Sequence, residues 1–249
     1  MRQLLLCIVA LWLFGCAPSS GEPLKSGSVF IARDEHGAPV VLRVDDMVHD
    51  AADPDGDVYW YALSQQDSSG VWRDYCVPDR EGKQLAIPLA GSWDGRRNHT
   101  STGAITFACT SGALAKCVRW GYKPWKAFNG VSLADYHQAC VRMTPADYCG
   151  DGTPHTRDGT SIGFWDHLGV RKRPDEPGMV FEAAWSPRGA VYLRKPRFGE
   201  PLADLSAACP DRLAGRTHIE APNLDDRAIA QRWPEALLFT ESFVRTDLP

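Results

Sequence analysis

Cysteine content is the feature that most constrains how this chain can fold. The sequence of 249 residues contains eight cysteines, and two of them lie within the first sixteen positions. The other six form an even set without the CxxC pairs that are typical of structural zinc sites. In an oxidising compartment they are expected to form three disulfides among Cys76, Cys109, Cys117, Cys140, Cys149 and Cys209.

The N-terminus predicts such a compartment. Arg2 precedes an apolar run from Leu4 to Phe14, which is the pattern of an export signal. This run is shorter than the ~20 residues that a transmembrane helix needs to cross a bilayer. Residues 1–15 are therefore expected to be a signal peptide that is removed from the mature protein.

The end of this run resembles the lipobox of bacterial lipoproteins, because Leu13-Phe14-Gly15 is followed directly by Cys16. The resemblance implies lipidation of Cys16, with palmitate among its acyl chains, and a membrane anchor. Residues 16–27, rich in Ser, Gly and Pro, would form a flexible tether. Ala17 replaces the aspartate associated with inner-membrane retention, so the resemblance implies the outer membrane of a bacterial cell envelope. An ordinary signal peptide with a chance cysteine is the alternative.

The charge pattern gives no indication of a nucleic-acid partner. The chain has 27 basic and 31 acidic residues, for a formal net charge of −4. Its densest basic run, residues 171–173, is followed at once by Asp175 and Glu176, as in a solvated turn. The membrane, reached through the lipid anchor, is the one partner that the sequence indicates, and it does not identify a protein or glycan partner.

The first half of the chain is predicted to be antiparallel strands. Apolar runs rich in β-branched and aromatic residues occur at residues 29–31, 39–44, 58–63, 71–76 and 103–109. Turn-forming clusters at residues 34–37, 53–57 and 67–70 separate the first four runs and contain glycine and aspartate. These clusters favour tight hairpin connections.

The second half combines helices with further strands. Leu133, Tyr136, Cys140 and Met143 recur at helical spacing, which predicts a helix over residues 133–143. A further helical turn is expected at residues 146–149, because Thr144 and Pro145 can begin a helix. The remaining predictions are strands at residues 161–165, 179–185, 190–193 and 237–244, and short helices at residues 201–208 and 225–233.

Together these elements predict a β-rich α+β fold with antiparallel strands, a short central helix and disulfide staples. One globular domain is expected over residues 28–249, because no long low-complexity linker interrupts it. Sequence does not fix the disulfide pairing. Short loops favour Cys109 with Cys117 and Cys140 with Cys149, which leaves Cys76 for Cys209.

One stretch resembles a known family. Residues 146–152 read Ala-Asp-Tyr-Cys-Gly-Asp-Gly, and His155-Thr-Arg-Asp-Gly-Thr follows at residues 155–160. This resembles the signature of the ADYC-domain family of bacterial secreted and lipid-anchored proteins. Residues 107–112, 116–125, 137–140 and 181–185 are similar too, so the resemblance covers about residues 100–195. It implies no activity, ligand or catalytic residue.

The same stretch holds the densest polar cluster of the sequence. It contains Asp147, Asp151, His155, Arg157 and Asp158. Oxygen-rich loops can bind Ca²⁺, although this spacing does not fit an EF-hand loop. The structural interpretation is that these residues build turns and pair individually, so that no cofactor is bound. A catalytic site is the third alternative.

Other catalytic patterns are weak. Cys149 lies near His137 and His155 in sequence, but a bridged cysteine cannot act as a nucleophile. The tryptophans are expected to fill the core, with Trp125 as the exposed exception that could stack on a sugar. The sequence thus favours a non-catalytic binding or structural module, and the alternative is an envelope hydrolase or metal-binding protein centred on residues 147–158.

Overall fold

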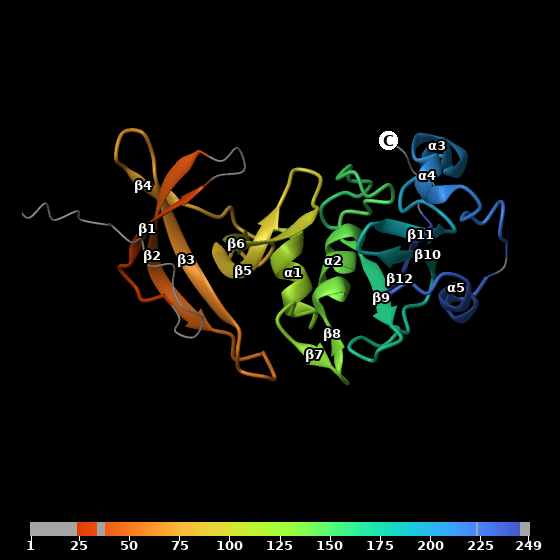
Figure 1. Cartoon of the computed structure of the whole chain (residues 1–249), viewed down its shortest axis with the longest axis horizontal. Coiled ribbons are helices and arrows are strands. Elements are labelled where there is room, and N and C mark those ends of the chain that lie inside the picture. The colour runs from red at the N-terminus through yellow and green to blue at the C-terminus, as the bar shows by residue number, and fades with distance from the viewer. Residues whose placement is uncertain (1–23, 34–37, 223, 245–249) are drawn as a thin grey trace, which may run out of the picture.

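Two antiparallel sheets form the two ends of the molecule, and two helices lie between them (Figure 1). The computed structural model describes residues 24–33, 38–222 and 224–244. The expected signal peptide and Cys16 lie outside these residues, so lipidation stays a prediction. No helix in the described ranges combines the length and apolarity that crossing a bilayer requires.

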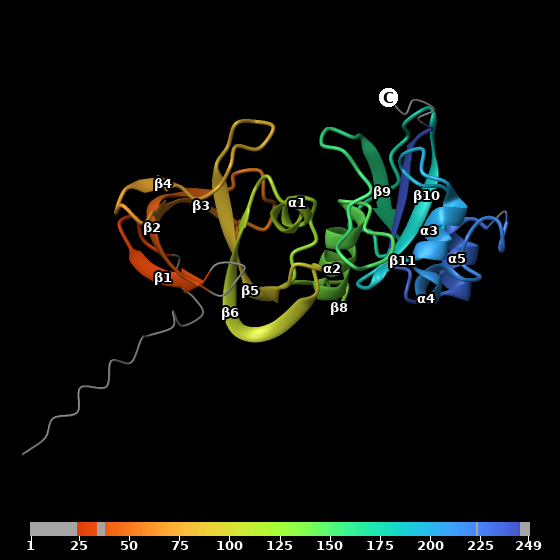
Figure 2. The same ribbon diagram turned by 90° about the horizontal axis from the view of Figure 1, so that it is seen from above.

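The N-terminal sheet has the strand order β1-β2-β3-β5-β6. The short strand β4 also pairs with β3, at a different part of that strand from β5. Its strands are β1 (Val29–Arg33), β2 (Pro39–His49), β3 (Tyr59–Gln66), β4 (Trp72–Asp74), β5 (Leu85–Trp93) and β6 (His99–Cys109). Register shifts at Ala90 to Ser92 and at Val44 to Asp46 mark β-bulges. Bulges bend strands, and Figure 2 shows the strong curvature of this sheet.

The predicted strands of this half are confirmed, with two corrections. The strand expected at residues 71–76 is limited to β4, and β5 was not predicted at all. Pro88 and Gly91 interrupt the β5 sequence, and both residue types normally argue against a central strand. The sheet tolerates them because β5 packs Ala86, Ile87 and Leu89 into the core.

The C-terminal sheet has the order β11-β10-β12-β9, and helices cover both of its faces. Its strands are β9 (Ile162–Asp166), β10 (Met179–Ser186), β11 (Gly189–Leu193) and β12 (Leu238–Phe243). On one face lies α2 (Ala134–Met143), and on the other lies α5 (Asp226–Arg232). The helices α3 (Leu202–Ala208) and α4 (Pro210–Leu213) complete this half. The four strands, α3 and α5 agree with the predicted elements, whereas α4 was not predicted.

Between the sheets, α1 (Ala113–Arg119) packs on the N-terminal sheet and lies beside α2. The hairpin of β7 (Ala127–Phe128) and β8 (Val131–Ser132) connects the two helices. The prediction of α2 is confirmed, but its buried surface is wider than the predicted face. His137 and Arg142 are also about 1 % exposed, because α2 is enclosed between α1 and the sheet.

All six predicted cysteines form disulfides, but the predicted pairing is wrong. The bridges are Cys76–Cys109, Cys117–Cys140 and Cys149–Cys209. Residues 113–119 form α1 rather than a short loop, and this helix places Cys117 against Cys140 of α2. The prediction for the tryptophans is confirmed for those buried in the core, Trp60, Trp165, Trp185 and Trp233. It is also confirmed for Trp125, the predicted exposed tryptophan, which is 45 % exposed.

Candidate ligand-binding cleft

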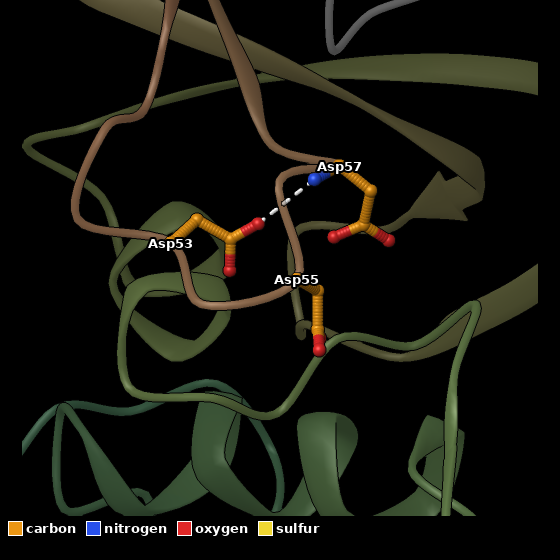
Figure 3. Close-up of side chains that lie close together, drawn as sticks. All are labelled: Asp53, Asp55 and Asp57. Carbon is orange, nitrogen blue, oxygen red and sulfur yellow. Dashed lines mark hydrogen bonds between the residues drawn. The ribbon is translucent and has the colours of Figure 1, made fainter.

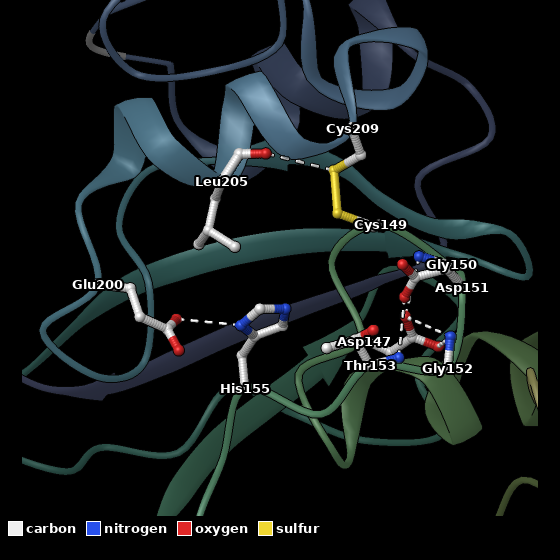
Figure 4. Close-up of a disulfide and its surroundings, with 10 residues drawn as sticks. All are labelled: Asp147, Cys149, Gly150, Asp151, Gly152, Thr153, His155, Glu200, Leu205 and Cys209. Atoms are coloured by element: carbon white, nitrogen blue, oxygen red, sulfur yellow. Dashed lines mark hydrogen bonds and ion pairs between the residues drawn. A yellow bond between two sulfur atoms is a disulfide. The ribbon is translucent and has the colours of Figure 1, made fainter.

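The predicted polar loop at residues 147–158 begins with a structural carboxylate. Ala146 has a left-handed backbone (φ 56°), so residues 146–149 turn the chain instead of continuing a helix as expected. Asp147 is fully buried, and it accepts a hydrogen bond from Arg142 Nη1 at 2.6 Å. The backbone amides of Gly150 and Gly152 also donate to it (Figure 4). This carboxylate therefore shapes a turn and neutralises a buried arginine.

The rest of the Ala-Asp-Tyr-Cys segment is structural as well. The Tyr148 hydroxyl lies 3.2 Å from Glu182 Oε1 and accepts a hydrogen bond from the Arg197 amide, and both side chains are fully buried. Cys149 is bridged to Cys209, which excludes thiol catalysis at this position. A Cβ at Gly150 would lie 1.9 Å from the Arg188 carbonyl oxygen, so only glycine fits this close approach.

The other members of the predicted site have separate partners. Asp151 accepts a hydrogen bond from the Thr153 amide at 2.8 Å. His155 Nδ1 lies 3.1 Å from Glu200 Oε2, and its ring points to that partner in Figure 4. The Arg157 guanidinium stacks 5.1 Å from the Phe198 ring centroid. These side chains do not converge on a common point, as a catalytic or metal-binding set must.

A second polar cluster lies in the turn between β2 and β3, which the sequence predicted only as a turn. Carboxylate oxygens of Asp53, Asp55 and Asp57 lie within 4.8 Å of one another (Figure 3). Lys123 Nζ donates to all three, at 2.5, 2.8 and 2.7 Å, and the lysine is 4 % exposed. An internal ammonium therefore occupies the position that a metal ion would take among these oxygens.

The electrostatics of this cluster favour the charged forms of Asp57 and Lys123. Burial alone would raise the pKa of Asp57, but hydrogen bonds from Lys123, Trp125 and Lys126 outweigh burial and hold this pKa well below its usual range. Burial likewise opposes the charge of Lys123, yet its hydrogen bonds to the three aspartates raise its pKa. Asp57 and Lys123 are therefore charged at neutral pH, and a bound Ca²⁺ would have to displace Lys123.

A cleft of about 1380 Å³ lies in the described part of the chain. Its walls come from the β2–β3 connection, the β4–β5 connection at residues 79–85, residues 110–121 around α1, and residues 156–160. Of the five predicted polar residues, only Arg157 and Asp158 line it. Trp120, Phe128 and hydroxyl groups such as that of Ser111 add aromatic and polar surface.

Some of the charges in the cleft are already paired. Arg119 lies 3.2 Å from Asp79 and stacks 4.7 Å above the Trp60 ring. Lys123 is held by the aspartate triad described above. These pairs come from segments that are distant in sequence, so sequence reasoning did not find them.

The geometry defines a strand-rich, disulfide-stapled α+β protein with a charged cleft between its secondary-structure layers. The ADYC domain model matches residues 24–199, and the chain belongs to this family. The match extends well beyond the predicted residues 100–195 and includes the N-terminal sheet and every residue that lines the cleft. Comparisons with curated proteins and with solved structures give no match. The family assignment brings no activity with it.

Proposed function

We propose that this chain is a lipid-anchored protein of the bacterial cell envelope whose ADYC domain is a non-catalytic binding module. The observation that carries this proposal is the cleft of about 1380 Å³, whose walls combine segments from across the chain. Two disulfides brace these walls, because Cys109 immediately precedes the cleft residue Thr110 and Cys117 ties α1 to α2. A preformed concave site is the usual geometry of ligand binding.

The structural roles of the residues in the polar loop at residues 147–158 favour binding over hydrolysis. Asp147 is committed to Arg142 and to backbone amides, and His155 to Glu200. An enzyme needs an acid, a base or a nucleophile that faces a common substrate position. The predicted hydrolase residues have individual structural roles instead, which supports a module without chemistry of its own.

The three disulfides support export, since such bridges persist in oxidising compartments. The lipobox-like Leu13-Phe14-Gly15-Cys16 supports an anchor at Cys16, and Ala17 favours the outer membrane. In this proposal the membrane partner is reached through lipid, and the tether presents the cleft outside the cytoplasm.

The anchor is tested by mass spectrometry of the protein purified from its native envelope. We expect an N-terminal peptide that begins at acylated Cys16. Cys16→Ser should abolish the acyl mass and the membrane association, and Cys7→Ser, in the apolar run, should change neither. An unmodified Cys16 in a chain that keeps residues 1–15 would overturn the anchor.

The binding module is tested by thermal unfolding of the acylated protein in detergent, with and without a soluble extract of the envelope. We expect the extract to raise the unfolding temperature, because a ligand that binds only the folded state stabilises it. The components of the extract should be chemically unchanged after incubation with the protein. Accumulation of cleavage products would contradict a non-catalytic role, and an unchanged unfolding temperature would contradict binding.

A further inference from the structure

We infer that the cleft binds an anionic oligosaccharide, a carbohydrate that carries carboxylate or phosphate groups. This inference rests on the proposed function, because it names the ligand class of the same site. It is carried by the balance of unpaired charge in the cleft, by the placement of two arginines at its rim, and by its size and aromatic surface.

The charge balance of the cleft is positive, although the chain is acidic. Eight Lys and Arg side chains line it, against six Asp and Glu. Arg119 and Lys123 pair inside the cleft, whereas Arg97 and Arg197 face Asp147 and Glu182 behind it. Within the described ranges, four lining cations have no ion pair: Arg80, Lys83, Lys116 and Arg157.

Only two lining carboxylates of the described chain lack an ion pair, and one of them is engaged otherwise. Asp50 accepts a hydrogen bond from the Trp60 indole nitrogen at 2.9 Å and another from the Ala52 amide. Asp158 is exposed at the same turn as Arg157. Four unpaired cations therefore face two carboxylates, an excess that favours a ligand with several negative charges.

One of these cations contacts the loop that carries another, although the two come from different parts of the chain. Arg80 belongs to the β4–β5 connection, yet its Nη2 atom lies 3.5 Å from the position of a Cβ on Gly159. Arg157 is two residues before that glycine, and its guanidinium is supported by the Phe198 ring. Both arginines thus line the cleft where residues 79–85 meet the loop at residues 156–160. Guanidinium groups bind carboxylate and phosphate with bidentate geometry.

The remaining surface of the cleft fits a carbohydrate. Its volume of about 1380 Å³ exceeds the ~300–1,000 Å³ of small-molecule pockets, which indicates an oligomeric ligand. The partly exposed rings of Trp120 and Phe128 offer flat apolar faces to the C–H faces of sugar rings. The hydroxyls of Ser111, Thr156 and Thr160 can bind sugar hydroxyls.

The test is isothermal titration of the acylated, full-length protein in detergent. The anionic probes are pentagalacturonate for carboxylates and pentamannose phosphate for phosphate, and maltopentaose is the neutral probe. Phosphatidylglycerol vesicles distinguish a lipid headgroup from a glycan. We expect at least one anionic probe to bind, with an affinity that falls as salt is raised from 50 to 200 mM, and maltopentaose to bind at least tenfold more weakly.

Variants locate the binding. Arg157→Gln and Lys116→Gln should each weaken the anionic probe about tenfold, because each removes a charge-assisted contact. Arg227→Gln on α5 and Lys172→Gln remove exposed cations that do not line the cleft, and they should stay within twofold of the wild type. Because all four side chains are at least partly exposed, we expect wild-type unfolding temperatures throughout.

The outcomes separate this inference from the proposed function. If maltopentaose binds as tightly as the anionic probes, and the cleft variants have no effect, the anionic class is wrong while a binding module stands. If only the vesicles bind, the glycan is overturned in favour of a lipid headgroup. If no probe binds, the inference fails, and the proposed function is then decided by the envelope extract.

Discussion

Replacing Lys123 with methionine tests how the two halves of the cleft are held together. The lysine side chain is 5 % exposed and Asp53 is 5 % exposed, whereas Asp55 and Asp57 are 48 % and 30 % exposed. Removing one partner of a buried ion pair costs ~3–5 kcal/mol, because the remaining charge is left uncompensated. Since two of the three carboxylates keep contact with water, we expect the lower end, about 3 kcal/mol.

For a domain of this size, such a loss lowers the unfolding temperature by roughly 6–12 °C. The matched control is Lys126→Met, because Lys126 is 36 % exposed and lies 3.2 Å from the same Asp57. An exposed pair of this kind contributes ~0–1 kcal/mol. Thermal unfolding of the two variants at neutral pH and low salt gives the comparison.

The Lys123→Met variant should also acquire a calcium response that the wild type lacks. It leaves three carboxylates whose oxygens lie within 4.8 Å of one another, and such an oxygen cluster suits Ca²⁺. At a calcium concentration ten times the dissociation constant, the variant should regain ~1.4 kcal/mol. The reasoning is refuted if Lys123→Met matches Lys126→Met in stability, or if calcium stabilises the wild type equally.

Three further predictions concern stability. Burial lowers the pKa of His137 to about 4, so the unfolded chain binds the extra proton between pH 4 and 6.5; the free energy of unfolding should fall by up to ~3 kcal/mol as pH drops through that window, and urea titrations of His137→Gln should show a flatter profile. Replacing both Cys149 and Cys209 with alanine opens a bridge with a sequence separation of 60 and should cost ~4 kcal/mol, whereas equal unfolding temperatures for variant and wild type would contradict this. Gly150→Ala should lower the unfolding temperature far more than Gly82→Ala, because a Cβ at Gly82 meets nothing within 4 Å although both glycines have positive φ.

Local patterns in the sequence predicted most of the strands and α2. The β-branched runs and the turn residues 53–57 are read over a few positions, and the helical spacing from Leu133 to Met143 is read over eleven. By contrast, α1 has only seven residues, and its N-cap residue Gly112 has no side chain to cap it, so it carries little local indication of a helix. Missing α1 also produced the wrong partner for Cys117.

The candidate site was less predictable, because closeness in sequence did not mean convergence in space. Positive φ values at Ala146, Gly150 and Gly152 turn the chain sharply, which buries Asp147 and directs His155 to a different partner. In the Lys123 cluster, by contrast, residues that are distant in sequence converge in space. Its lysine and Asp53 are 70 residues apart, and only tertiary packing brings them together.

The most direct test of the central claim is hydrogen exchange of the acylated protein, measured by mass spectrometry with and without the soluble envelope extract. If the cleft is the ligand site, exchange should slow in residues 79–85, 110–121 and 156–160 and stay unchanged in α5 on the far face of the C-terminal sheet. Slower exchange confined to α5, or no change anywhere in the chain, would contradict the account.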